Sequence, residues 1–371
     1  MSTNRYQLIA LVAKGAFIAL MLALTAVYFA SDVREAGGAL AFQAAQETSR
    51  SPGGTLLVAN RTGGSVSLFD LVSGVEMARV PIGPAIPHEV AVSPDGRLAL
   101  AGEYGPNDGP GRHVAVIDIT EGRLVGRIDV GPKSRPHSVV FLPDGRRAVV
   151  TLEQSDRLAL LDVAERKVLR TYPTGGREGH MVRLSPDGAR AFVTSRGAEG
   201  TLSVISLASD ASPVVIPTGE GAEGLAVTPD GREVWVVNRI ARSISIVDTG
   251  SLEITHTIDV PPDARRAEIS ASGRVLVPHA GTEEAPAQYL SVYDMRSRAL
   301  VSRLAMHEGR KGPGGFGIHI VGERAFVSDR ADRALFIMSL DDVKTRRMLA
   351  TDHDDPDGLA VSPVRVAVLE R

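Results

Sequence analysis

The stretch EVAVSPDGRLALA, residues 89–101, consists of an apolar strand, a Pro-Asp-Gly turn and a second apolar strand. Proline presets φ at the first corner of such a turn and glycine takes positive φ, so the segment predicts a tight strand–turn–strand unit. The pattern recurs, with full copies at 138–150, 181–193 and 224–236, degraded copies at 268–277 and 318–327, and a half copy at 358–363. The chain is therefore expected to consist of repeats of one small β unit.

The spacing of these copies predicts the architecture. Successive turn glycines are 49, 43, 43, 42 and 49 residues apart, and each copy is followed by two further strands, as at 114–118 and 123–130. A period of roughly 40–50 residues made only of strands is typical of a β-propeller with one four-stranded blade per repeat. We therefore predict an all-β fold, a seven-bladed β-propeller over residues 55–371, preceded by an N-terminal transmembrane or signal helix.

The two ends of the predicted propeller are complementary. Residues 55–82 supply the last three strands of a blade, and residues 358–362 supply a first strand without successors. Pairing the two would close the ring and remove the open edges of a partial blade. Residues 364–369 also have the pattern of a second strand and compete with 56–60 for the same place.

Composition excludes several kinds of protein. The chain has 371 residues, a net charge of −3 and no cysteine. The charge balance gives no support for nucleic-acid binding. The lack of cysteine excludes disulfides, thiolate catalysis, cysteine-bound metal and a lipoprotein anchor.

The N-terminal segment indicates the compartment. Residues 8–30 are apolar except for Lys14, and Arg5 precedes them. Twenty-three residues are enough to cross about 30 Å of hydrocarbon, and the positive flank predicts that the following domain lies outside the cytoplasm. A signal peptide is the other interpretation, with an apolar region at 15–30 and cleavage after the Ala-x-Ala sequence at 39–41.

Both interpretations give the same domain plan. Residues 1–31 form a membrane anchor or signal peptide, and residues 32–54 form a flexible linker rich in small and polar residues. The propeller is expected on the periplasmic side of the inner membrane, attached by one span, or secreted to the periplasm if the N-terminus is cleaved.

Part of the chain resembles known propeller families. The segments VWVVN at 234–238 and ISIVD at 244–248, with the Pro-Asp-Gly turns, resemble the YVTN-repeat (YncE-like) seven-bladed propellers. The segment at 135–153 is similar to a blade of the lactonase-type propellers. The resemblance covers about residues 55–369 and implies a soluble or extracytoplasmic propeller that acts at the mouth of its central channel. It does not imply one activity, because propellers support many.

Insertions indicate which face of the propeller binds. The segments at 102–113, 280–288 and 306–317 lengthen connections that all lie on the face opposite the Pro-Asp-Gly turns. Insertions on one face of a repeat array usually mark its binding face. We therefore expect a protein, peptide or glycan partner at this loop-rich face, or a small anionic ligand in the channel mouth.

Aligned blades predict two rings of residues around the channel on that face. The first ring lies at the start of each innermost strand and comprises His88, His137, His180, Glu223, Arg265, Phe316 and Asp357. The second lies at or just beyond the end of each second strand and includes Arg61, Glu103, Tyr104, Glu153, Arg196, Arg239, His279 and Arg330. Side chains from both rings are expected to converge on the channel axis.

These rings suggest three kinds of chemistry. Three imidazoles in consecutive blades, His88, His137 and His180, could hold a divalent metal. His137 with Glu153 and Glu103 could act as general acid and base. The arginines of the rings would favour an anionic ligand or an oxyanion. The candidate ligand-binding residues are Arg61, Tyr104, Arg196, Glu223, Arg239, Arg265, Arg330 and Asp357.

Three functional hypotheses remain open at this point. The first is a membrane-anchored binding or scaffold module, since no complete catalytic motif is present. The second is a lactonase-like or metal-assisted hydrolase at the channel mouth. The third is a subunit of a redox complex. The rings could also be polar only because a propeller channel holds water.

Overall fold

The computed structural model describes residues 53–83, 86–106, 109–281, 287–308, 317–330, 333–342, 346–351 and 355–367. Within these ranges the chain forms β-strands and one short 3₁₀ turn, Glu153–Ser155. No helix in these ranges is long and apolar enough to cross a membrane. The span or signal peptide predicted at 8–30 and nearly all of the predicted linker lie outside the described residues.

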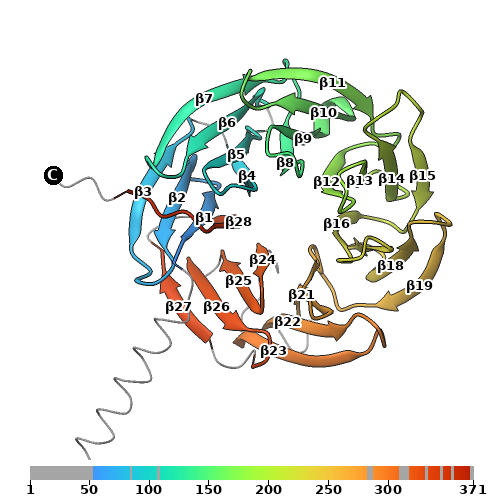
Figure 1. Ribbon diagram of the computed structural model, residues 1–371. Helices are drawn as coiled ribbons and strands as arrows, with labels where there is room; N and C mark the ends of the chain where they lie inside the picture. The colour runs from blue at the N-terminus through green and yellow to red at the C-terminus, as the bar shows by residue number, and fades with distance from the viewer. Residues whose placement is uncertain are drawn as a thin grey trace, which may run out of the picture. The chain divides into compact units, whose positions relative to one another are not determined.

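The strands form seven four-stranded antiparallel sheets around a central axis, so the prediction of a seven-bladed propeller is confirmed (Figure 1). The blades are numbered here from the N-terminus, and the strands of each are given from the centre outward. Blade 1 comprises β28 (Pro356–Ser362), β1 (Thr55–Asn60), β2 (Ser65–Asp70) and β3 (Glu76–Pro81). Blade 2 comprises β4 (Pro87–Val92), β5 (Leu98–Glu103), β6 (His113–Asp118) and β7 (Arg123–Asp129).

The remaining blades follow in chain order. Blade 3 comprises β8 (Pro136–Phe141), β9 (Arg147–Leu152), β10 (Arg157–Asp162) and β11 (Lys167–Pro173). Blade 4 comprises β12 (Gly179–Leu184), β13 (Arg190–Ser195), β14 (Thr201–Ser206) and β15 (Val214–Pro217). Blade 5 comprises β16 (Ala222–Val227), β17 (Glu233–Asn238), β18 (Ser243–Asp248) and β19 (Ile254–Asp259).

The last two blades are less regular. Blade 6 comprises β20 (Glu268–Ile269), β21 (Arg274–Ala280), β22 (Ala287–Asp294) and β23 (Leu300–Glu308). Blade 7 comprises β24 (Ile318–Val321), β25 (Arg324–Asp329), β26 (Ala334–Ser339) and β27 (Arg346–Ala350). The innermost strand of blade 6 has only two residues, where the Pro-Asp-Gly copy is degraded.

The predicted ring closure is confirmed. β28 pairs antiparallel with β1, from Thr55 opposite Ser362 to Asn60 opposite Pro356. Residues 364–367 form no strand, so the predicted competition for the place of β1 does not arise in the described chain. The backbone amide of Ala367 instead donates to the carbonyl of Thr120, 2.7 Å away, and residues 368–369 lie outside the described residues.

The hydrophobic core lies between neighbouring blades. One cluster joins Leu100 and Val116 of blade 2 to Val150 and Leu161 of blade 3, and all four are buried. The inner three strands of each blade are covered on both faces, which explains their continuous Val, Ile, Leu and Ala runs. The fourth strand is at the rim, so its side chains are partly exposed, as in β19.

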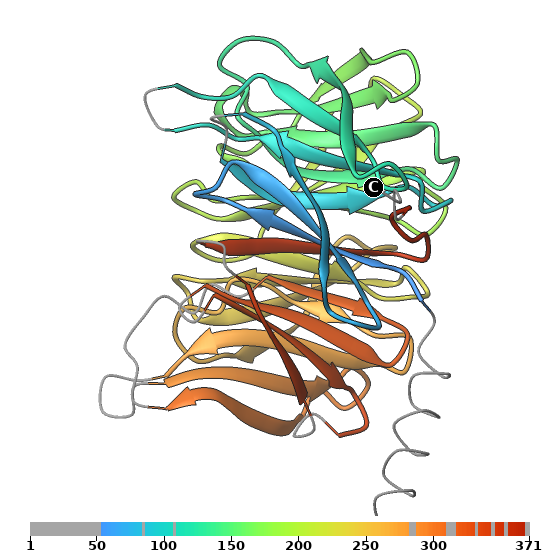
Figure 2. The same cartoon turned by 90° about the vertical axis from the view of Figure 1, so that its left-hand side faces the viewer.

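Each innermost strand begins, and each second strand ends, on the same face of the disc, because neighbouring strands in a blade are antiparallel. We call this the well face; the Pro-Asp-Gly turns lie on the opposite face. Figure 2 shows the disc edge-on, with its strands running between the two faces. Both predicted rings therefore belong to the well face, while most residues of the insertions at 280–288 and 306–317 lie outside the described ones.

Candidate functional site

A β-bulge directs the first ring of side chains toward the channel. In blades 1 to 5 the pairing between the first and second strands shifts by one residue, as between Pro136 and Val139 in blade 3. Two residues of the first strand therefore lie opposite one residue of the second, and a bulge of this kind changes the direction of the side chains. The first extra residue in each blade is a predicted ring member: Asp357, His88, His137, His180 and Glu223.

A second backbone feature precedes these residues. The residue two positions before a ring member has a left-handed backbone in five blades: Arg135, Glu178, Gly221, Asp263 and Asp355, with φ of 53°, 56°, 73°, 57° and 68°. Four of these are not glycine, and such conformations carry a strain cost outside glycine. The repetition shows that one local conformation brings the chain into the innermost strand in these five blades.

Hydroxyl groups of the neighbouring blade fix the ring backbone. Thr151 donates to the carbonyl of His180 at 2.7 Å, and Thr194 donates to the carbonyl of Glu223 at the same distance. Ser328 donates to the carbonyl of Asp357 at 2.8 Å. At these three places a strand of one blade holds the start of the innermost strand of the next, so His180, Glu223 and Asp357 are anchored by strands and not by loops.

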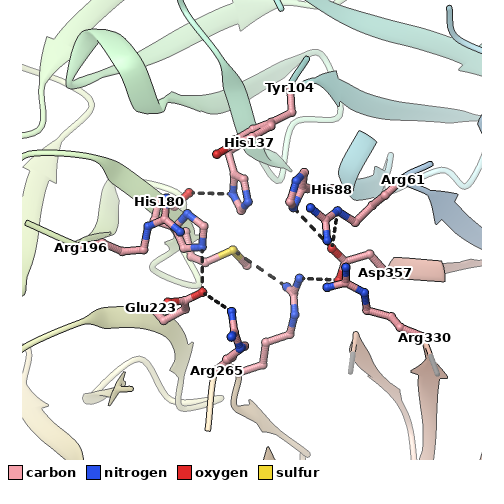
Figure 3. A pocket seen from close by; sticks show the side chains of 12 residues that line it. Arg61, His88, Tyr104, His137, His180, Arg196, Glu223, Arg265, Arg330 and Asp357 are labelled. Carbon is pink, nitrogen blue, oxygen red and sulfur yellow. Dashed lines mark hydrogen bonds and ion pairs between the residues drawn. The ribbon is translucent and has the colours of Figure 1, made fainter. Parts of the chain in front are cut away.

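The rings enclose a polar cavity of about 270 Å³ at the channel mouth, which we call the well (Figure 3). Ten predicted site residues line it: Arg61, His88, Tyr104, His137, His180, Arg196, Glu223, Arg265, Arg330 and Asp357. Met181 and Arg266 also line it and were not predicted. Phe316 lies outside the described residues. The rings inferred from sequence therefore meet in space.

Aromatic rings form one wall of the well. His137 stacks on His180 with centroids 4.0 Å apart, and His88 lies 4.9 Å from His137. Tyr104 lies 4.4 Å from His88 and meets His137 edge-on at 5.3 Å. The three histidines converge as predicted, and their rings lie side by side along one wall of the well.

His180 lies between two carboxylates. Its Nδ1 is 3.0 Å from Oε2 of Glu153, and its Nε2 is 3.6 Å from Oε1 of Glu223. Burial alone would lower the pKa of His180, but the two acceptors outweigh burial and raise its pKa above the ordinary value. Both nitrogens of the buried His180 ring face carboxylates, so the site favours its protonated form.

The two carboxylates beside His180 stay ionised. Glu153 also accepts from Tyr104 at 2.9 Å and from Arg196 at 2.5 Å. Burial would raise the pKa of Glu153, but His180, Arg196 and Tyr104 lower it. Burial opposes ionisation of Glu223 as well, yet His180 and nearby arginines lower its pKa to about 2.

His137 is neutral. Burial and the neighbouring charge of His180 hold the pKa of His137 well below its ordinary value. Its Nδ1 lies 3.2 Å from the carbonyl of His180, and because a carbonyl only accepts, Nδ1 carries the proton. The Nε2 of His137 is then the nitrogen with a free lone pair.

His88 completes the wall on the other side. Its Nδ1 lies 3.4 Å from Oδ2 of Asp357. Burial lowers the pKa of His88, and the hydrogen bond and charge of Asp357 offset only part of this. The Nε2 of His88 is buried and has no hydrogen-bond partner within the described ranges. It is therefore a polar atom available to a bound molecule.

Arg266 crosses the bottom of the well. It lies just before blade 6, forms an ion pair with Glu89 of blade 2, and lies 3.0 Å from Oδ1 of Asp357 in blade 1. Burial would lower the pKa of Arg266, but Glu89 and Asp357 raise it, so the guanidinium stays charged. Aligning the blades placed Arg265 in the ring and missed Arg266, because the two-residue strand β20 is too short to show which residue of blade 6 matches the ring positions of the other blades. The sequence signal that could have indicated Arg266 is the pair of adjacent arginines at 265 and 266.

Four of the predicted ring residues that the structure describes do not line the well. His279 instead lies 2.7 Å from the Ala280 carbonyl and 2.8 Å from the Ser291 hydroxyl. Glu103 was predicted to join Glu153, but its carboxylate accepts from Arg127 at 2.6 Å and lies 3.2 Å from Nδ1 of His113, so it points along its own blade. Glu153 lies behind His180 and Tyr104. Arg239 lies beyond Glu223, 3.2 Å from it. A catalytic pair of Glu103 and Glu153 is therefore not formed.

A metal-ligating cluster is present, though not the predicted one. The ligand atoms of His137, Glu153 and His180 lie within 4.8 Å of one another. His88, the third predicted ligand, is not part of this group. Imidazole and carboxylate suit a divalent transition metal. Metal binding here would require His180 to lose its proton and one of its carboxylate contacts.

Comparison with known proteins identifies the fold alone. No family model and no curated protein matches the chain. The structure is similar to hydrazine synthase from Kuenenia stuttgartiensis, with TM-score 0.61 and 18% identity over 70% of this chain and 78% of that one. It is also similar to a functionally unknown protein from Desulfotomaculum acetoxidans DSM 771, with TM-score 0.67 and 16% identity over 83% of this chain and 99% of that one. The resemblance to YVTN-repeat and lactonase-type families stays a prediction.

Proposed function

We propose that this protein is a binding module whose well takes a small, oxygen-rich anion of the carboxylate or phosphate class. One observation carries the proposal: arginines from four blades converge on a single cavity of about 270 Å³. They are Arg61 of blade 1, Arg196 of blade 4, Arg265 and Arg266 before blade 6, and Arg330 of blade 7. Arginine is favoured where planar recognition of carboxylate or phosphate is needed.

The carboxylates of the site support this interpretation because they hold the arginines in place. Arg265 lies 2.9 Å from Asp263 and 3.5 Å from Glu223, and Arg61 lies 3.4 Å from Asp355. A guanidinium has five N–H donors, and these ion pairs engage only part of them. The remaining donors line a site that is organised before a ligand arrives, which lowers the entropic cost of binding.

The histidine wall adds a positive charge and a hydrogen-bond acceptor. The raised pKa of His180 favours its charged form, which strengthens the field felt by an anion. Nδ1 of His88 faces Asp357, so its buried, unsatisfied Nε2 carries a lone pair and would accept from a hydroxyl of the ligand. The cavity is smaller than a typical site for a drug-sized molecule. A ligand of a few heavy atoms, such as a short carboxylate or phosphate, therefore fits the well itself.

A metal-assisted hydrolase is the second candidate, supported by the cluster of His137, Glu153 and His180. In that case Nε2 of His137, which has a free lone pair, would be the ligand atom most readily available to the metal. The contacts of His180 with Glu153 and Glu223 favour a proton over a metal at its two nitrogens. We expect no stoichiometric zinc or manganese by elemental analysis of the full chain. Metal that is retained by the wild type and lost in His137→Ala would instead support the hydrolase.

The wider role of the domain is also a proposal. Propellers commonly mediate protein binding, and the loop-rich face is the surface we propose for a protein, peptide or glycan partner. An extracytoplasmic, membrane-anchored location is proposed from residues 8–30 alone. Fractionation of cells that express the full chain tests the location, and recovery in the cytoplasm would contradict it.

The anion proposal is tested by thermal unfolding with acetate, malonate, phosphate and sulfate at constant ionic strength. A ligand that binds only the folded state raises the transition temperature in proportion to its saturation. We expect one class of anion to stabilise the wild type, and the effect to be lost in Arg265→Gln and kept in Arg232→Gln, because Arg232 is exposed far from the well. Equal shifts with all four salts, or a shift that survives in Arg265→Gln, would reject the proposal.

A further inference from the structure

A second hollow adjoins the well on the same face. It has a volume of about 820 Å³ and lies between blades 3 and 4, and we call it the outer groove. Its walls include Arg135, Arg177, Glu178 and Gly197. Tyr104 and Arg196 line both the well and the groove, so the two hollows meet at these residues.

The junction is rigid. The hydroxyl of Tyr104 donates to Glu153 at 2.9 Å, and Arg196 donates to the same carboxylate at 2.5 Å. The guanidinium of Arg135 covers the Tyr104 ring, 5.0 Å from its centroid. Tyr104 and Arg196 are therefore held in place at the border between the two hollows.

The charged residues of the outer groove are equal in number: Arg135, Arg177 and Arg196 against Glu153, Asp156 and Glu178. Glu153 and Glu178 both lie near Arg196, and Asp156 accepts from the backbone amide of Glu178 at 2.6 Å. The Arg177 side chain is exposed and forms no ion pair in the part of the chain that the structure describes. A second anionic group of a ligand would find its counter-charge at Arg177.

The groove is open because of a small residue. Gly197 follows Arg196 directly, whereas blade 5 has Ile240 at the equivalent place after Arg239. Gly197 has no left-handed backbone that would require glycine, and a Cβ there would lie 3.3 Å from the Cβ of Arg177. Glycine at this position thus clears space beside Arg177.

We propose that the outer groove is a second subsite for the ligand of the well, and that this ligand is an elongated molecule with two anionic groups. This rests on the proposed function: one group binds the arginines of the well, and the other reaches Arg177. The chemical class is that of α,ω-dicarboxylates and similar extended dianions.

The test is calorimetric titration of the full chain with acetate, malonate, glutarate, pimelate and azelate at constant ionic strength. We expect affinity to rise at least tenfold between malonate and the longer dicarboxylates. Arg177→Gln should abolish this gain while leaving malonate affinity within twofold, and Gly197→Ile should do the same by filling the groove. Arg232→Gln is the matched control.

The outcomes separate the two proposals. Malonate binding without a gain at longer chain length, or a gain that persists in Arg177→Gln, would overturn the second subsite and leave the well intact. No binding at any chain length would overturn the second subsite and exclude carboxylates as ligands of the well, and the thermal-unfolding test with phosphate then decides the anion proposal.

Discussion

Nδ1 of His180 lies 3.0 Å from Oε2 of Glu153. Glu223 approaches the opposite nitrogen of the same buried ring. Both contacts raise the pKa of His180 and favour its positively charged form in the absence of a ligand.

We expect His180 to titrate above pH 6.5 and His137 to stay neutral at the same pH. Because the folded pKa of His180 is raised, its contribution to stability is complete below about pH 6.5 and is lost as pH rises through the folded pKa. Glu153→Gln should lower the His180 pKa, because one acceptor of its charge is removed. Imidazole ¹⁵N NMR measures both residues, and titration of His180 at or below 6.5 would contradict the assignment.

Arg266 should be the most important single charge for stability. Arg266→Leu leaves Glu89 and Asp357 buried without their shared partner, and breaking a buried ion pair costs about 3–5 kcal/mol. Chemical denaturation measures the loss, with Arg232→Leu as an exposed control that should change little. The double variant Glu89→Gln/Arg266→Leu should recover part of the loss. A cost for Arg266→Leu no larger than that of the control would show that the bridge is not formed.

Gly224 should not tolerate a side chain. A Cβ there would lie 2.4 Å from the backbone carbonyl oxygen of Arg265 in the next blade, so the blades would have to separate. We expect Gly224→Ala to lower the free energy of unfolding by about 1–3 kcal/mol. Gly63→Ala is the control, because its nearest neighbour would be 3.5 Å away. Equal stability of the two variants would contradict the close approach of blades 5 and 6.

Loss of stability in mild acid should depend partly on His279. Burial lowers the pKa of His279 to about 4, and its two nitrogens lie 2.7 Å from the Ala280 carbonyl and 2.8 Å from the Ser291 hydroxyl. A lowered folded pKa means that stability is lost as pH falls below about 6.5, where the unfolded state takes up the proton. Between pH 7 and pH 5, His279→Gln should lose roughly 2 kcal/mol less stability than the wild type. Parallel pH profiles for the two proteins would contradict this.

Much of the fold was predictable from the sequence because its signal is local and repeated. The Pro-Asp-Gly turns give the period, and the period gives seven blades and the closure of β28 onto β1. The positions of His88, His137 and His180 follow from the same alignment. The role of Arg266 was not predicted, because the Pro-Asp-Gly turn and the first strand of blade 6 are degraded.

The partners of the site residues were not predictable in the same way. Glu103 ends the second strand of blade 2 and Glu153 directly follows the second strand of blade 3, yet one points to Arg127 and His113 while the other faces His180. That difference depends on which side chains of other strands and blades offer donors. The left-handed residues before five of the ring members could not be predicted from the sequence either, because four of the five are not glycine.

The most direct test of the account is calorimetric titration of the full chain with malonate at pH 7 and constant ionic strength. We predict saturable binding of one malonate per chain. Arg61→Gln and Arg265→Gln should weaken it at least tenfold, and Arg232→Gln should leave it unchanged. Absence of saturable binding to the wild type, or equal affinity in all variants, would contradict the claim that the well is an anion-binding site.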